Sequence, residues 1–427
     1  MICFVRNLSL TSPRRKSGPS PSARDWFPAF AGMTALMLLM LAPLEAAEVK
    51  PVVSAQVLGG QYYYSGSESA LGALASLVAS PYTKFNDRWS LVPLYSGTYQ
   101  GTKQVQDLIG GGTLFQDSQN HDVSLKGIRS FENGLKLKAV TGYGIELLRE
   151  TKDEGWSNGL YNNRRLSAGT EAEWSWAKES YVRLAYDYFK IGFPNYQSLS
   201  SQAAAEGQGR ELDAPNVLDS RNHMATLGAQ TALPRDGLLE SSVSETWSSY
   251  ADQHVVDLSG TLTPESRKDR AEALMIQGTW PVYSGSQCRL SGSLGYTRTH
   301  LYSNQNHYDA SRTFFNPDYY AYLTNSLQSQ WTLLAGEAPW TFQLNGSLAR
   351  QKYSDRLVQD GDGNYGTGAT HVDFATVGFS VSYPIAQGFQ VKAMSAVGWN
   401  DSNNTYTKLY QYHYCTQNYL FGFTYAY

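Results

Sequence analysis

The last nine residues, "YLFGFTYAY" (419–427), place an aromatic side chain at every second position. These side chains belong to Tyr419, Phe421, Phe423, Tyr425 and Tyr427, and leucine, glycine, threonine and alanine stand between them. Alternate residues share one face of a β-strand, so the stretch predicts a strand with a fully aromatic face. Such a face needs an apolar cover, which is either a second layer of protein or lipid.

The same nine residues resemble the C-terminal signal of bacterial outer-membrane β-barrels, whose final strand ends on an aromatic residue and turns alternate apolar side chains outward. The resemblance implies that the five aromatic residues form an assembly signal for the barrel assembly machinery. It also implies a location in the cell outer membrane, with membrane lipids as the cover.

Composition agrees with a wall that has one apolar and one polar face. The 427 residues have a mean hydropathy of −0.39 and only 17% charged residues, against roughly 25% in soluble domains. Tyrosine (30) and glycine (38) are abundant. This mixture is typical of membrane-spanning β-strands. The net charge of −3 gives no reason to expect a nucleic-acid partner.

The start of the chain predicts a signal peptide over residues 1–47. An apolar run covers residues 35–44, which is shorter than the about 20 residues needed to span a bilayer as a helix. Small residues follow and place cleavage between Ala46 and Glu48. The preceding basic segment is long for a signal peptide, so a true start at Met33 is an alternative.

From about Trp89 onward the chain repeats an alternating run, a short turn, a second alternating run and a long polar connection. In residues 389–399, for example, odd positions are mostly apolar and even positions include Gln390 and Lys392. The runs exceed ten residues, which suits tilted transmembrane strands and not the 5–6 residues usual in sandwiches. The prediction is an all-β fold, a transmembrane antiparallel up-and-down β-barrel over residues 88–427.

The predicted number of strands is about fourteen. Residues 53–64 read as one further strand, but residues 69–80, "SALGALASLVAS", carry leucines at helical spacing. Segment 48–87 is therefore predicted to be an N-terminal extension that enters the barrel as a plug. A sixteen-stranded barrel that uses this segment as another hairpin is the alternative.

The sequence indicates no catalytic residue, cofactor or metal site. The seven histidines are scattered, and the three cysteines form no metal-binding or redox spacing. "DGDGN" (360–364) lacks the later glycine and glutamate of a calcium loop, so a solvated turn is predicted. We expect a protein that is not an enzyme, with an outer-membrane hydrolase as the alternative.

Strand alternation predicts which charged side chains face the lumen. They are Lys136, Lys138, Glu146, Arg183, Asp187, Arg289 and Lys392. Two interpretations stay open, namely a balanced lattice of ion pairs and a basic zone that favours anionic solutes.

The longest connection, residues 193–220, is predicted to be the third outside loop. It resembles the third loop of general porins, which folds into the barrel and narrows it. Its charged side chains would then form an electrostatic gate: Glu206, Arg210, Glu211, Asp213 and Asp219. A mobile surface loop is the alternative.

The function predicted from these observations is an outer-membrane channel, similar to a porin, for passage of small solutes. The alternatives are a non-conducting barrel that acts as a surface scaffold or adhesin, or a membrane enzyme. The sequence identifies neither the solute nor the oligomeric state.

Overall fold

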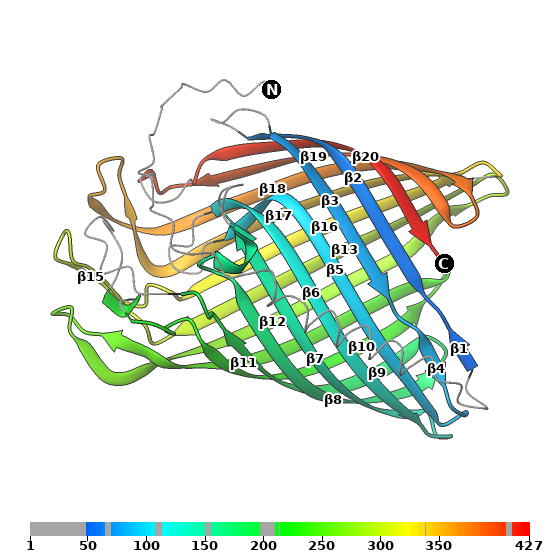
Figure 1. The fold of residues 1–427 in the computed structure, drawn as a ribbon, viewed down its shortest axis with the longest axis horizontal. Helices are drawn as coiled ribbons and strands as arrows, with labels where there is room; N and C mark the ends of the chain where they lie inside the picture. The colour runs from blue at the N-terminus through cyan, green and yellow to red at the C-terminus, as the bar shows by residue number, and fades with distance from the viewer. Residues whose placement is uncertain are drawn as a thin grey trace.

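The computed structural model describes residues 48–64, 70–106, 113–149, 155–196, 210–212, 214–337, 339–406 and 412–427. Among these residues one antiparallel sheet closes into a barrel (Figure 1). Sixteen strands form its wall: β2 (Val53–Tyr64), β3 (Ala70–Ala79), β5 (Trp89–Gln106), β6 (Thr113–Ser130), β7 (Leu135–Arg149), β8 (Asn163–Ala177), β9 (Ser180–Gly192), β10 (Ser220–Leu233), β11 (Gly237–Val256), β12 (Leu262–Ser284), β13 (Cys288–Ser303), β16 (Tyr322–Ala335), β17 (Trp340–Gln359), β18 (Tyr365–Ala386), β19 (Phe389–Ser402) and β20 (Tyr414–Ala426).

Short elements complete the structure. At the end of the barrel that carries the short turns, β1 (Glu48–Lys50) pairs with β4 (Tyr82–Lys84). Between β13 and β16, β14 (His307–Asp309) and β15 (Phe314–Asn316) form a small hairpin of their own. Two single-turn helices, η2 (Trp156–Asn158) and η3 (Arg210–Leu212), lie in the connections. No helix in the described ranges is long and apolar enough to cross a membrane.

Pairing between the first and last wall strands closes the barrel. β2 and β20 pair from Ser54 opposite Ala426 to Tyr64 opposite Thr416. The backbone N–H of Val53 donates to the carbonyl of Tyr427 at 3.1 Å, and the Tyr427 N–H donates to Val53 at 2.8 Å. Closure gives each of the sixteen described wall strands a partner on both sides, which lets a β-sheet cross a membrane without exposing backbone polar groups to lipid.

The predicted count of fourteen strands is wrong, and the alternative of sixteen is confirmed. Segment 48–87 supplies the hairpin β2–β3 to the wall and is not a plug. The leucines of β3 misled the prediction because this strand is apolar on both faces. Leu71 and Leu77 are exposed on the outer face, while Leu74 packs inside against Leu58 and Leu420. A strand without polar alternation cannot be told from a helix by spacing.

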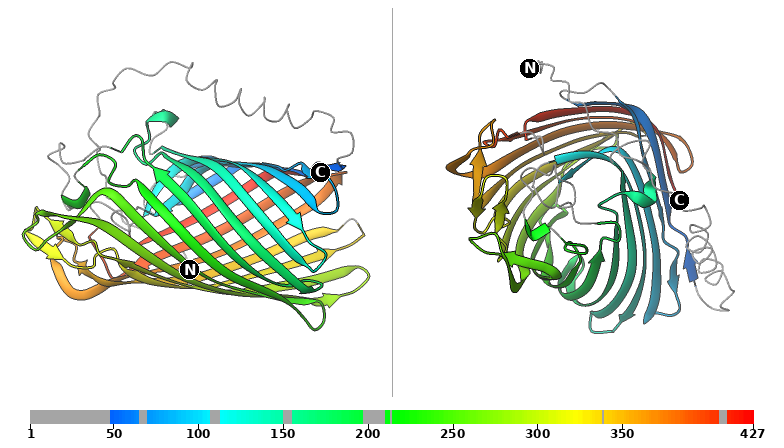
Figure 2. Two further views of the ribbon diagram at one scale, coloured as in Figure 1. Left: turned by 90° about the horizontal axis from the view of Figure 1, so that it is seen from below. Right: turned by 60° about the vertical axis from the view of Figure 1, so that its left-hand side comes forward.

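The strands of two hairpins are longer than predicted. Residues 251–269 and 354–370 look like long polar loops in the sequence, but much of each belongs to β11–β12 and β17–β18. The remaining turns cover 257–261 and 360–364. In the second, the Asp360 carboxylate accepts the backbone N–H groups of Asp362 and Asn364, as in a tight polar turn. These hairpins extend the wall on the loop side of the barrel (Figures 1 and 2).

Candidate functional site

The outer surface of the wall carries a band of exposed apolar side chains. It includes Leu184, Leu227, Leu344 and the C-terminal residues Phe421 (60% exposed) and Phe423 (53% exposed). Near the short turns the band ends in exposed aromatic residues, among them Trp174, Trp176, Trp331 and Trp340. An outward apolar band bordered by aromatic residues is the surface that a lipid bilayer covers. The chain is therefore a transmembrane β-barrel of the outer-membrane class.

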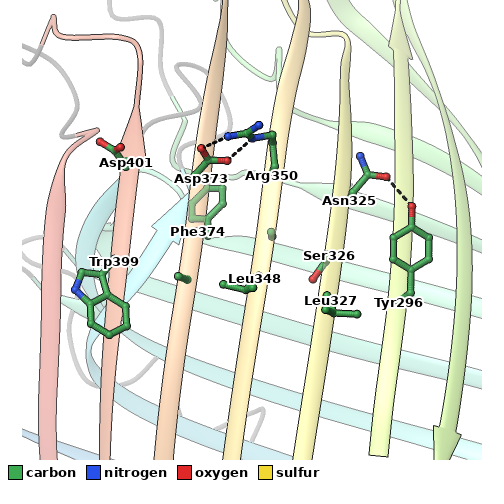
Figure 3. Close-up of a pocket in the computed structure, with 12 residues that line it drawn as sticks. Tyr296, Asn325, Ser326, Leu327, Leu348, Arg350, Asp373, Phe374, Trp399 and Asp401 are labelled. Carbon is green, nitrogen blue, oxygen red and sulfur yellow. Dashed lines mark hydrogen bonds and ion pairs between the residues drawn. The ribbon is translucent and has the colours of Figure 1, made fainter.

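The opposite border of this band is visible in a groove on the outer wall (Figure 3). Leu327, Leu348 and Trp399 form its apolar part. Two residues further along each of the same three strands stand Asn325, Arg350 and Asp401. Arg350 makes two hydrogen bonds, at 2.6 and 2.7 Å, to Asp373 on β18. The change from apolar to charged residues marks where the wall leaves the hydrocarbon layer.

The inner faces of β7, β8 and β9 carry a ladder of ion pairs, which we call the charged wall. Lys138 Nζ lies 2.5 Å from carboxylate oxygens of both Glu171 and Glu173. Lys136 contacts Glu173 at 2.9 Å. Arg183 lies 3.6 Å from Glu171 and 3.9 Å from Glu240 on β11. Each positive charge in this ladder has a carboxylate beside it.

The other residues predicted for the lumen form no ion pair of the ladder. Glu146 accepts a hydrogen bond from Asn163 at 3.0 Å, and Asp187 lies beside Gly169 on β8. Arg289 is the second residue of β13. Lys392 lies 3.4 Å from Gln56 across the closing strands. Lys136, Lys138 and Arg183 are brought together in the ladder, and Asp187 lies at its end, close enough to Arg183 and Glu171 to interact electrostatically with both.

The inner faces of β16, β17 and β18 form a second surface, which we call the neutral wall. Their inward positions within the paired stretches 322–335, 341–353 and 372–382 carry no charged side chain. The polar side chains there are Tyr322, Thr324, Ser326, Gln328, Gln330, Thr332, Thr341, Gln343, Asn345, Ser347, Gln351, Tyr353, Thr376, Ser380 and Ser382. β17 lies opposite β7, because equally many strands separate them in both directions around the closed sheet.

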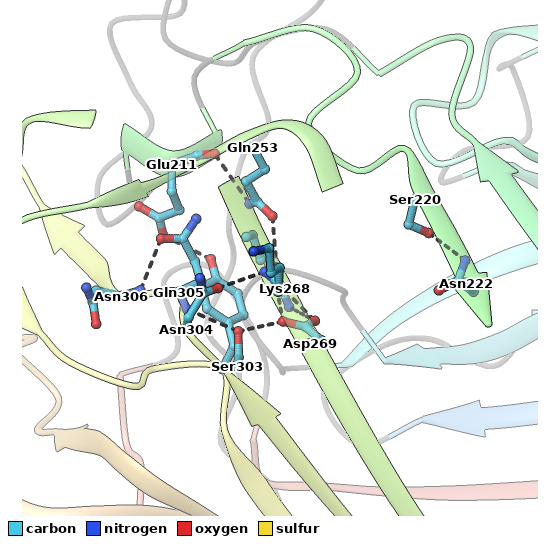
Figure 4. A network of polar contacts seen from close by, with 12 residues as sticks. Glu211, Ser220, Asn222, Gln253, Lys268, Asp269, Ser303, Asn304, Gln305 and Asn306 are labelled. Carbon is cyan, nitrogen blue, oxygen red and sulfur yellow. Dashed lines mark hydrogen bonds and ion pairs between the residues drawn. The ribbon is translucent and has the colours of Figure 1, made fainter. Parts of the chain in front are cut away.

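A buried polar network, which we call the mouth clasp, lies at the loop end of the barrel, and Figure 4 shows the part of it around Glu211, Gln253 and Asp269. Its centre is Glu211 of η3, whose side chain is fully buried. The carboxylate oxygen Oε1 accepts the hydroxyl of Tyr320 at 2.9 Å and lies 2.8 Å from His307 Nδ1. Gln253 of β11 donates to the backbone carbonyl of Glu211. The side chain of Glu211 thus holds η3 to the connection between β13 and β16, and its backbone carbonyl holds η3 to β11.

Two buried arginines complete the mouth clasp. Arg267 of β12 makes a forked ion pair with Asp269 and stacks against Tyr320 at 4.3 Å. Arg356 of β17 lies 4.3 Å from the ring of Tyr319 and donates to the hydroxyl of Tyr412. Burial raises the pKa of Tyr320 well above its ordinary value, and the Glu211 carboxylate raises it further. The tyrosine therefore stays protonated and can donate to Glu211.

The β14–β15 hairpin has a second anchor next to the mouth clasp. The buried carboxylate of Asp309 accepts hydrogen bonds from the hydroxyls of Ser311 and Tyr365 at 2.6 and 3.1 Å. Burial alone would raise the pKa of Asp309. The hydrogen bonds outweigh it and hold this pKa below its usual range.

The longest connection joins β9 to β10 and is the fourth outside connection, not the third. The error follows from the missed hairpin β2–β3. Glu206 and Asp213 lie outside the described residues, as does the side chain of Arg210. Glu211 is buried in the mouth clasp, and Asp219 accepts the backbone N–H of Phe193 at 2.8 Å, which joins the two ends of the loop. Apolar residues hold the same ends together: Phe193, Tyr196, Leu212, Val217 and Leu218.

The structure contains functional candidates that sequence reasoning missed. Arg267 and Arg356 lie in stretches that read as loops, Tyr319 and Tyr320 open a stretch that reads as a strand, and nothing in their spacing links them. Among the described residues, no group of three or more histidine, cysteine, aspartate or glutamate side chains would hold a metal ion. Cys288 and Cys415 are not joined to each other.

Comparison with known proteins finds similar folds and no relative by sequence. No family model and no curated protein matches the chain. Among solved structures, an in-vitro folded trimer form of OmpT, an outer membrane protein of Vibrio cholerae, is 12% identical with a TM-score of 0.45, over 90% of this chain and 100% of that one. OccAB1 of Acinetobacter baumannii is 12% identical with a TM-score of 0.43, over 88% and 96%. OpdQ of Pseudomonas aeruginosa is 12% identical with a TM-score of 0.41, over 89% and 98%.

Proposed function

We propose that the protein is an outer-membrane channel for small polar solutes, narrowed at its outer mouth by docked connections. The observation that carries the proposal is the polar inner surface. Hydroxyl, amide and paired charged side chains line the lumen from β7 to β18. Side chains fill an eight-stranded barrel, whereas sixteen strands leave room for an aqueous path. A barrel that served only as a scaffold would have no need of a hydrated interior.

The contacts of the mouth clasp support the proposal that the channel is narrowed at its outer mouth. Glu211 draws the connection between β9 and β10 onto the connection between β13 and β16, and Arg267 and Arg356 hold that second connection to the wall strands β12 and β17. In this proposal solutes enter beside the mouth clasp and pass between the charged and neutral walls.

Planar-bilayer recording of the purified, refolded protein tests the proposal. We expect discrete conductance steps that appear only after addition of the folded barrel. The heat-denatured sample is the control, because it contains the same chain without a lumen. Folded protein that inserts into the bilayer, as shown by protease protection, but carries no current would exclude a channel.

A further inference from the structure

We propose that the channel's preferred solutes are uncharged and rich in hydroxyl groups, as polyols and sugars are, and that they contact three amides of the neutral wall. This inference rests on the proposed channel function and names the chemical class that the channel passes. The three amides belong to Gln328 and Gln330 of β16 and Asn345 of β17.

The three amides are open to the lumen. All three residues are exposed, although they stand on the inward side of their strands, next to the lipid-facing residues Leu327 and Leu344. No hydrogen bond joins their side chains to any other described residue. Neighbouring polar side chains, by contrast, are satisfied within the wall, since Gln343 accepts from Ser380 at 3.2 Å and Ser347 bonds Thr376 at 2.6 Å.

Register places the amides in one patch. Gln330 is the cross-strand partner of Asn345, and Gln328 is the partner of Ser347. Directly paired residues have Cβ atoms about 4.5–5.5 Å apart, which is close to the spacing of groups on one small solute. Each amide has two N–H donors and a carbonyl acceptor, so the patch can both donate to and accept from hydroxyl groups.

Glycines shape the wall beside the patch. Gly295 stands opposite Gln328, and Gly378 stands opposite Asn345. A Cβ atom at Gly378 would lie 2.6 Å from Asn345 Oδ1, so the amide of Asn345 lies over this glycine. The missing side chains leave the amides accessible from the lumen.

Charge placement disfavours ions as the preferred solutes. The neutral wall has no charged side chain at inward positions of its paired stretches, and the lysines of the charged wall already contact carboxylates. An ion that shed water at the three amides would meet no charged side chain at the inward positions of β16, β17 and β18. The inward cations of the flanking strands, Arg289 of β13 and Lys392 of β19, pair with Leu334 and Ser382, four positions nearer the short turns than Gln330 or Gly378. A hydroxyl-rich solute would exchange hydrogen bonds to water for hydrogen bonds to amides at little net cost.

Solute efflux from liposomes tests the inference with three six-carbon solutes of similar size, namely sorbitol (neutral), gluconate (anionic) and glucosamine (cationic). Wild-type protein should release sorbitol fastest. In the variant Q328A/Q330A/N345A, sorbitol efflux should fall about threefold to tenfold, as loss of neutral hydrogen bonds predicts. KCl conductance of the same variant should change much less.

The control variant is Leu327→Met with Leu344→Met, which alters the lipid-facing neighbours and should leave efflux unchanged. Heat-modifiable migration shows that each variant is folded. Faster release of gluconate or glucosamine by the wild type overturns the inference, and this test needs no variant. Unchanged sorbitol efflux in the folded triple variant overturns it as well. In both cases the conductance remains, so a failed channel proposal is distinguished by loss of all current.

Discussion

The charged wall and the neutral wall obey the same rule, polar side chains inward and apolar side chains outward, but satisfy their polar groups differently. On the charged wall, register sets Lys136 opposite Glu173 and Lys138 opposite Glu171, so ion pairs form across neighbouring strands. On the neutral wall, the amides of Gln328, Gln330 and Asn345 are left open. The ion pairs of the charged wall form without a ligand, whereas the amides of the neutral wall can form hydrogen bonds with a solute in the lumen.

The largest expected effect tests whether the neutral wall faces the lumen at all. Leu344→Arg would put a charge into the hydrocarbon layer and should destabilise the barrel by about 2–4 kcal/mol. Asn345→Arg, one position along the strand, should leave stability nearly unchanged because its side chain reaches water. Urea unfolding in lipid vesicles measures both. Equal losses of stability would place β17 in the opposite orientation.

The next effect separates paired from unpaired polar groups. Lys138→Met leaves Glu171 and Glu173 with fewer partners and should cost about 1.5–3 kcal/mol, the usual range for hydrogen bonds to charged groups. It should also make the channel more selective for cations. Gln328→Met is the matched change on the neutral wall and should alter stability by less than about 0.5 kcal/mol. Similar costs in the two variants would mean that the ion-pair ladder contributes nothing.

Much of the fold can be predicted from the chain because a membrane wall imposes a strong pattern. The outward stripe at Phe421 and Phe423 and the inward placement of Lys136 and Lys138 both follow from period-two alternation. The alternation breaks down at β3, where Leu74 packs inside against Leu58. An apolar patch in the lumen removes the alternation on which the strand count depends.

The sites are harder to predict because their contacts cross long sequence distances. Glu211 meets His307 and Tyr320, and Arg267 stacks on the same tyrosine, through two connections with no regular pattern. Whether the neutral-wall amides have hydrogen-bond partners likewise depends on the register between strands, which the sequence alone does not show. The pairing of Gln330 with Asn345, together with Gly378 beneath Asn345, shows that the amide side chains lie close to one another.

An effect of similar size concerns the mouth clasp, which is anchored to β12 and β17 and therefore stands on the side of the neutral wall. Glu211→Ala removes the acceptor for Tyr320 and the partner of His307. Hydrogen bonds to a charged group contribute about 1.5–3 kcal/mol, so their loss should destabilise the docked connections by this amount. The population of channels whose connections are undocked should then rise about tenfold or more. Single-channel recording should show longer or larger open states. Glu337→Ala, an exposed carboxylate at a short turn, is the control and should behave as wild type.

The smallest expected effect is a dependence of the mouth on external pH through Asp309. Its pKa is held below the usual range, so its carboxylate stabilises the β14–β15 hairpin at any pH above the ordinary aspartate value of about 4. As the pH falls below that value and through the lowered pKa, protonation removes the negative charge that strengthens the hydrogen bonds from Ser311 and Tyr365, and the contribution is lost. Open states should therefore become more frequent as the pH on the loop side of the bilayer falls below about 4. Asp309→Asn lacks the titrating group and should remove this part of the pH response, while other carboxylates still titrate. If wild type and Asp309→Asn respond alike across this window, the hairpin is held by its apolar contacts, such as Phe314 stacked on Tyr365 at 4.0 Å, and not by the carboxylate.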